Sequence, residues 1–94
     1  MDDPSAWNTD IDAYSDSKAI EVIQARLTEW GWLASGSFTR GTLDDATVQA
    51  VIDFQNYCSE NVAAVTVTDP ADPIIGTDTL WQLFNADRTE ILRP

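Results

Sequence analysis

The chain has 94 residues, enough for one small domain with a single core, and 44% of them are hydrophobic, which suits a folded protein. Asp and Glu number 16 against 5 Lys and Arg, and the resulting net charge of -11 disfavours binding to nucleic acids and anionic membranes. Histidine is absent and cysteine occurs once, so histidine-based triads, His-containing zinc sites, thiolate clusters and internal disulfides are excluded.

Residues 1–16, MDDPSAWNTDIDAYSD, form a polar, acidic lead-in. We expect it to be mostly irregular and to lay Trp7, Ile11 and Tyr14 on the core. Its acidic start lacks the basic and apolar regions of a signal peptide, and no apolar run reaches the roughly 20 residues of a membrane-spanning helix. If this protein works outside the cell, we therefore expect it to be part of a longer exported protein.

The first predicted helix begins after Asp16 or Ser17, either of which is a suitable N-cap, and ends at Gly31. Its apolar residues recur with helical spacing at Ile20, Ile23, Leu27 and Trp30. After the loop LASGSFTRG, Asp44 or Asp45 opens a second helix. The apolar face of this second helix consists of Val48, Val51, Phe54 and Cys58.

The segment NVAAVTVTDPADP, residues 61–73, has the β-branched content of a short strand that its prolines would end. A short third helix begins at Thr77 or Asp78 and buries Leu80, Leu83 and Phe84. The two stretches RGTLDDATVQAV and DPIIGTDTLWQL share a turn that leads through Thr into a helix, which suggests two copies of one loop-to-helix unit.

Two glutamines fall on the apolar arcs of the predicted helices. Gln24 lies four residues after Ile20, and Gln55 lies four residues after Val51. A buried amide is tolerated only if its oxygen and nitrogen both find partners, which the backbone of a loop packed over the helix can supply. We therefore predict that both amides hold loops to helices and do not contact a ligand.

In this order the residues resemble the peptidoglycan-binding domain, a three-helix module appended to bacterial cell-wall hydrolases and phage lysins. The first family segment is matched by Ile20, Ile23, Gln24, Leu27, Gly31 and Trp32. The second is matched by Gly41, Leu43, Thr47, Ala50, Val51, Phe54 and Gln55. The third is matched by Asp72, Ile75, Gly76, Thr79, Leu80 and Leu83.

The same comparison shows departures in both repeat loops. Arg40 stands where the family favours Asp, and Asp44 and Pro73 stand where it favours Gly. The segment between Gln55 and Asp72 is also longer than usual. These changes leave the pattern of the helical core intact and affect the loops in which a ligand site would lie.

The resemblance implies an all-α fold, a small three-helix bundle with long connecting loops. We expect a lead-in over residues 1–16, the three-helix domain over residues 17–84 and a tail over residues 85–94. The implied function is a non-catalytic module that targets a larger protein to peptidoglycan in the bacterial wall. The alternative is a degenerate copy of the fold that serves as a protein-interaction or structural spacer without glycan affinity.

We expect no enzymatic activity, because the chain lacks histidine and any convincing pair of nucleophile and base. Carboxylate pairs such as Asp44 with Asp45, or Asp69 with Asp72, are better explained as capping and turn residues than as catalytic acids. The stretch DPADP lacks the alternating oxygen ligands of a helix-loop-helix calcium loop. No metal and no cofactor is therefore expected.

A ligand site is predicted around surplus aromatic residues. Trp81 lies off the centre of the apolar stripe of the third helix, and Tyr57 is similarly offset on the second helix. We expect both to line a shallow groove with Asp72, Thr77 and Asp78, where aromatic faces and a helix start could hold a stem peptide of the wall. The expected partners are peptidoglycan or its stem peptide and a covalently linked domain, with the protein itself a monomer at the cell wall.

Overall fold

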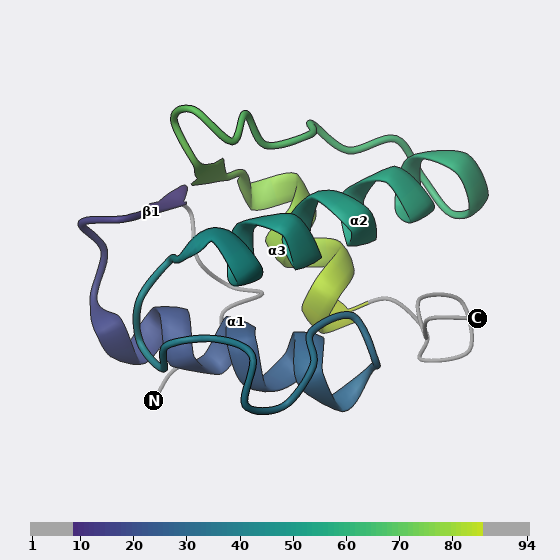
Figure 1. The fold of residues 1–94 in the computed structure, drawn as a ribbon. Coiled ribbons are helices and arrows are strands. Elements are labelled where there is room, and N and C mark those ends of the chain that lie inside the picture. The colour runs from purple at the N-terminus through teal and green to yellow at the C-terminus, as the bar shows by residue number, and fades with distance from the viewer. Residues whose placement is uncertain (1–8, 86–94) are drawn as a thin grey trace.

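The computed structural model describes residues 9–85 and contains three helices and a two-stranded ribbon (Figure 1). The elements in chain order are β1 (Ile11–Asp12), α1 (Ser17–Glu29), α2 (Asp45–Asn61), β2 (Ile74–Ile75) and α3 (Thr77–Asn85). This confirms the predicted three-helix bundle with long loops. None of the helices in the described part of the chain has the length and apolarity needed to cross a bilayer.

The helix ends follow from capping chemistry that the sequence predicts. The side chain of Asp16 caps α1 by accepting a 2.9 Å hydrogen bond from the Lys18 amide. At the other end, Gly31 follows the helix with a φ of +86°, a conformation that glycine adopts without strain. The side chain of Asp44 caps α2 by accepting from the Thr47 amide at 3.0 Å.

One core joins the three helices. Phe54 of α2 and Leu27 of α1 are fully buried, and Leu83 of α3 retains 1% of its exposure. The remaining predicted core residues, Ile23, Val51 and Leu80, lie in the same cluster. Trp32 also packs there, with its ring edge-to-face against Phe54 at 5.8 Å between ring centroids.

The predicted strand in residues 61–73 is wrong, because none of this segment forms a β ladder. Side chains of the neighbouring helices bind its backbone amides instead: the Thr66 amide donates to Asp78 at 2.7 Å and the Thr68 amide donates to Gln55 at 2.8 Å. The segment runs back along α2 and leads into β2 (Figure 1).

The lead-in differs from the prediction in two places: part of it forms a strand, and Tyr14 does not pack on the core. Ile11 pairs with Ile75 in the antiparallel β1–β2 ribbon, and its side chain is buried as expected. Tyr14 is 97% exposed, so the expectation that it covers the core is wrong. It lies in the turn between β1 and α1, where its amide bonds to Asp12 and its ring projects into solvent. Trp7 lies outside the described residues.

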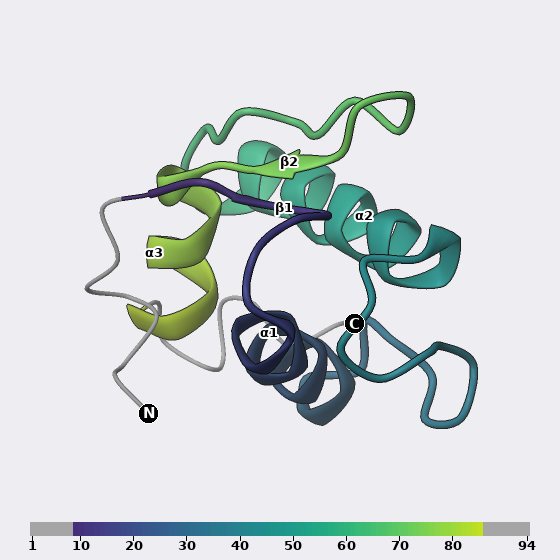
Figure 2. The same ribbon diagram turned by 90° about the vertical axis from the view of Figure 1, so that its left-hand side faces the viewer.

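The ribbon crosses the open side of the bundle. Figure 2 shows β1 and β2 side by side, with α1 below them, α3 on one flank and α2 behind. Residues 9–12 and 74–78 are therefore adjacent in space although they are far apart in the sequence. This arrangement places the second long loop beside the start of α3.

Candidate functional site at the second loop

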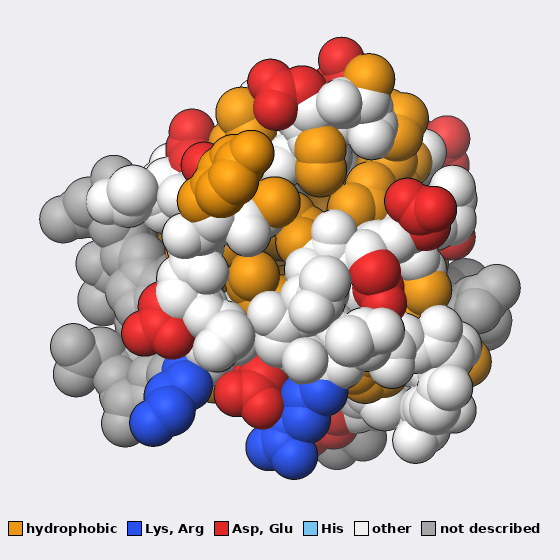
Figure 3. Space-filling view, turned by 60° about the vertical axis from the view of Figure 1, so that its left-hand side comes forward, with side chains coloured by type: hydrophobic (Ala, Val, Ile, Leu, Met, Phe, Trp, Pro, Cys, Tyr) orange, Lys and Arg blue, Asp and Glu red, His pale blue; other side chains and the backbone are white. Residues whose placement is uncertain are grey.

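An open hollow of about 540 Å³ lies between the loop after α2, the ribbon and the start of α3. Its lining consists of Asp10, Thr66, Val67, Thr68, Asp69, Asp72, Ile74, Gly76, Thr77 and Asp78. Figure 3 shows a face of the molecule on which hydrophobic side chains gather with acidic side chains around them. The blue side chains visible in that view lie at its lower edge. The lining of the hollow contains four aspartates together with Val67 and Ile74, so the hollow is acidic and partly apolar.

Gln55 fixes the loop that forms one wall of this hollow. Its amide nitrogen donates to the hydroxyls of Thr68 at 2.9 Å and Thr79 at 3.0 Å. Its oxygen accepts from the Thr68 amide at 2.8 Å, and Thr68 in turn donates through its hydroxyl to the Ile74 carbonyl. The Gln55 side chain is fully buried. It therefore ties α2, the loop and α3 together, as the sequence predicts.

Gln24 has the same role at the first loop. Its nitrogen donates to the carbonyls of Thr39 and Thr42 and to the hydroxyl of Thr47, all at 2.9 to 3.0 Å. Its oxygen accepts from the Gly41 amide at 2.8 Å. Each glutamine thus binds the loop after its own helix and the threonine at the start of the next helix. The two loop-to-helix units suggested by the sequence share this arrangement.

Asp78 holds the rim of the hollow. Its carboxylate accepts hydrogen bonds of 2.7 Å from the Thr66 amide and from the Thr79 amide. A Cβ added at Gly76 would lie 2.8 Å from the Asp78 Oδ1 atom, which these bonds keep in place. A larger residue at position 76 would therefore force the Asp78 carboxylate to shift from its present place.

The first loop holds an aspartate in a comparable way. Partial burial by itself raises the pKa of Asp44, but hydrogen bonds from the Thr39 amide and from the Thr47 hydroxyl and amide outweigh it. The pKa of Asp44 consequently lies below its usual value of 3.8. Asp44 is ionised at neutral pH and serves as a cap.

Three of the five residues predicted for the ligand site line the hollow: Asp72, Thr77 and Asp78. Trp81 is absent from its lining but 53% exposed, and on α3 it follows Thr77 by four residues and Asp78 by three. This spacing puts the three residues on one face of α3, but Trp81 itself does not line the hollow.

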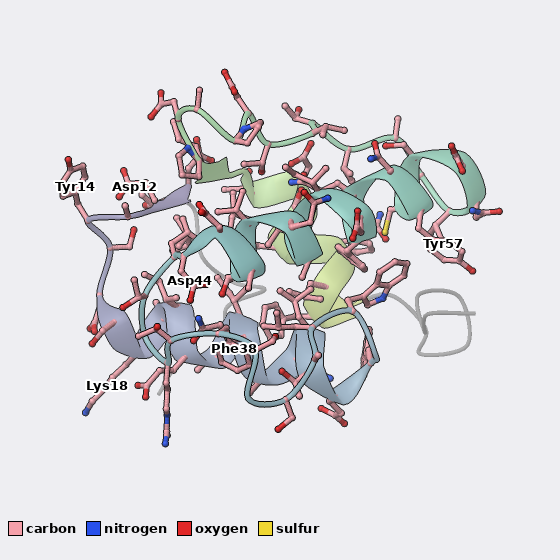
Figure 4. All side chains as sticks on the ribbon, in the orientation of Figure 1. Asp12, Tyr14, Lys18, Phe38, Asp44 and Tyr57 are labelled. Atoms are coloured by element: carbon pink, nitrogen blue, oxygen red, sulfur yellow. The ribbon has the colours of Figure 1, made fainter. Side chains whose placement is uncertain are left out.

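Tyr57 lies elsewhere. It occupies the C-terminal half of α2 (Figure 4) and is half-buried, with its ring 5.3 Å from that of Trp32 between centroids. The structure therefore places Tyr57 on the edge of the core and not in the lining of the hollow.

Several residues of the hollow were not predictable from the sequence. Asp10 and the segment Thr66–Asp69 reach it only because the ribbon and Gln55 bring distant segments together. The single usable signal was the pair of prolines in TDPADP, which marks a turn-rich loop.

Two features of the described residues concern metal binding and the reactivity of the single thiol. In residues 9–85 no group of three or more His, Cys, Asp or Glu side chains is arranged to hold a metal ion. The thiol of Cys58 is buried in the core, and its burial raises its pKa to about 11. It therefore stays protonated at neutral pH and is a poor nucleophile.

The fold and the two glutamine-held loops define a small helical module of repeated loop-to-helix units. Residues 16–59 match the sequence model of the family described as "Putative peptidoglycan binding domain", which confirms the resemblance seen in the sequence. The matched range contains α1, the first loop and most of α2, and it ends before the hollow. Searches among curated proteins and among solved structures gave no match.

Proposed function

We propose that this protein is a non-catalytic module that binds peptidoglycan and targets a larger protein to the bacterial cell wall. The observation that carries the proposal is the family match over residues 16–59, because this range contains the first complete loop-to-helix unit with Gln24 at its centre. A module of this kind raises the local concentration of its partner domain at the wall.

The hollow and the neighbouring Trp81 are the proposed ligand site. Asp72, Thr77 and Asp78 offer polar groups at the start of α3, and the exposed indole offers an apolar face beside them. Sugars and short peptides bind to such combinations of aromatic and hydrogen-bonding groups. The stem peptide of peptidoglycan is the ligand that fits this combination within the proposed function.

Sedimentation with purified, insoluble sacculi tests the proposal. The protein should appear in the pellet with the sacculi and stay in the supernatant without them, and soluble wall fragments should release it. Cellulose of the same particle size is the control for adhesion to an insoluble glycan. Equal partition with sacculi and cellulose would contradict wall binding.

The alternative is a spacer or protein-interaction domain that has kept the fold and lost the ligand. One observation favours it: the family match ends at residue 59, whereas the hollow is built largely from residues 66–78. A protein that stays folded but fails to sediment with sacculi at any salt concentration would support the spacer function.

A further inference from the structure

A second depression lies between the first loop and the outer face of α1. It consists of two hollows of about 310 and 160 Å³ that share Glu21, Ala25 and Arg40 in their linings. Lys18 and Val22 line the larger hollow, and Phe38 lines the smaller one. We call this surface the α1 groove.

The floor of the α1 groove is apolar although it faces away from the core. Lys18, Val22 and Ala25 follow one another at helical spacing on α1, with Ala25 exposed and Val22 half-buried. Phe38 closes the groove from the first loop, in front of α1 (Figure 4). Because Gln24 anchors that loop through Thr39 and Gly41, the groove is held open in the folded protein.

The α1 groove also collects the positive charge of the described residues. Residues 9–85 contain three cationic side chains, and two of them, Lys18 and Arg40, line this groove. The third, Arg26, stacks its guanidinium on the rings of Trp30 at 4.8 Å and Phe84 at 5.0 Å. Glu21 also lines the groove, so its two cations and one carboxylate leave it weakly positive, which among residues 9–85 favours an anion here on a protein with a net charge of -11.

Arg40 is positioned and still has donors to offer. Its Nε lies 2.5 Å from the Glu21 Oε1 atom in an ion pair between two residues that both line the groove. The side chain is 83% exposed, and a guanidinium has five N–H donors, more than one carboxylate can satisfy. Lys18 projects outward from the start of α1 on the same side of the molecule (Figure 4).

The geometry points to the α1 groove as a binding site for the terminal carboxylate of a short peptide with small apolar side chains. In the wall this is the alanine-ended stem peptide, so the inference rests on the proposed function and adds the α1 groove as a second site, separate from the hollow, for the carboxylate end of that peptide. Lys18 and Arg40 take the carboxylate, and the surface of Val22, Ala25 and Phe38 takes the alanine methyls. A polyanion fits less well, since the net charge of -11 repels repeated negative charges.

The first test uses N-acetyl-D-alanyl-D-alanine and its C-terminal amide as probes. Two-dimensional NMR of the labelled protein should show saturable shifts at the amides of Val22, Ala25 and Gly41 with the acid and much smaller shifts with the amide. Added salt should weaken the effect of the acid. Equal responses to acid and amide, or shifts confined to other surfaces, would overturn the inference.

The second test uses Lys18→Gln and Arg40→Gln in sacculus sedimentation. Each variant should bind roughly three- to fivefold more weakly, as expected for an exposed charged contact, and the double variant about tenfold or more. Asn56→Asp, on the exposed face of α2, changes the net charge by the same amount and should bind like the wild type. Unchanged thermal unfolding in each variant checks that the fold is intact.

The outcomes separate the two hypotheses. Sacculus binding that is equal in wild type and double variant leaves the proposed function standing and rejects the α1 groove. If the wild type itself fails to bind sacculi, the proposed function fails, and the NMR comparison of acid with amide then decides whether the groove recognises a carboxylate.

Discussion

The two buried amides, Gln24 and Gln55, show how single side chains can fix irregular backbone. The oxygen of each side chain accepts a hydrogen bond from a loop amide. The nitrogen of each donates to carbonyls or hydroxyls of the loop and of the helix that follows it. Their position on the apolar arc of a helix made this role predictable from the sequence, because a buried amide needs partners on both atoms. Which loop atoms would serve as partners was not predictable, since they come from segments 13 to 24 residues away.

Replacing Gln55 with Leu should lower the free energy of unfolding by about 1 to 3 kcal/mol, because the Thr68 amide and the Thr68 and Thr79 hydroxyls lose their buried partner. Urea denaturation followed by fluorescence measures the change. Gln49→Leu, at an exposed position of the same helix, is the matched control and should stay within about 0.5 kcal/mol. A Gln55→Leu variant that is as stable as this control would show that the clamp does not stabilise the fold.

Replacing Trp81 with Ala should weaken sacculus binding by about 1 to 3 kcal/mol, because Trp is a typical binding hot spot and Trp81 is exposed on the same face of α3 as Thr77 and Asp78 of the hollow. The midpoint of urea denaturation should change little, since the indole is 53% exposed. Tyr14→Ala, at an almost fully exposed aromatic residue in the turn between β1 and α1, serves as the control. Loss of stability without selective loss of binding would assign Trp81 to the scaffold.

Helices and loops differed in how well the sequence defined them. The helices were predictable because apolar periodicity, acidic caps at Asp16 and Asp44, and Gly31 all gave the same boundaries. The β1–β2 ribbon was not, because strands of two residues are too short for a periodic pattern. The α1 groove was also missed, since Lys18 and Arg40 come together only when the first loop folds over α1.

The stability that Asp44 contributes as the N-cap of α2 should depend on pH. Because the folded pKa of Asp44 is lowered, its ionised form contributes stability above its ordinary pKa of 3.8, and this contribution is lost as the pH falls through the folded pKa. Asp44→Asn should therefore be less stable than the wild type at neutral pH by about 0.5 to 1.5 kcal/mol, because the amide keeps one acceptor oxygen for the Thr39 and Thr47 amides that now bond to two. The difference should shrink as the pH falls below 3.8 and through the lowered folded pKa of Asp44, as measured by urea denaturation across the acidic range. A difference that is constant with pH would contradict the role of the charge.

Charge dominates the behaviour of the molecule as a whole. The net charge of -11 is spread over a small domain, and the cations among residues 9–85 are the pair at the α1 groove and Arg26 on the aromatic rings. The sequence alone gave the total charge but not this distribution. A protein of this kind repels itself in the folded state and stays soluble at neutral pH.

Added salt should raise the midpoint of thermal unfolding by a few degrees between about 10 and 200 mM sodium chloride, because screening reduces the repulsion among acidic side chains. Differential scanning fluorimetry measures the midpoint, and a neutral osmolyte at equal osmolality separates screening from solvent exclusion. A midpoint that falls with salt would mean that attractive ion pairs outweigh repulsion in the fold.

The β1–β2 ribbon matters for anyone who cuts this module from its chain. Ile75 is 1% exposed in the structure and pairs with Ile11, five residues before the matched family range begins at residue 16. A fragment cloned from that residue onward would leave the backbone edge of β2 unpaired and the side chain of Ile75 without the cover of Ile11, which invites association between copies. Expression boundaries should therefore start upstream of residue 10, and poor solubility of a shorter piece would reflect the missing strand.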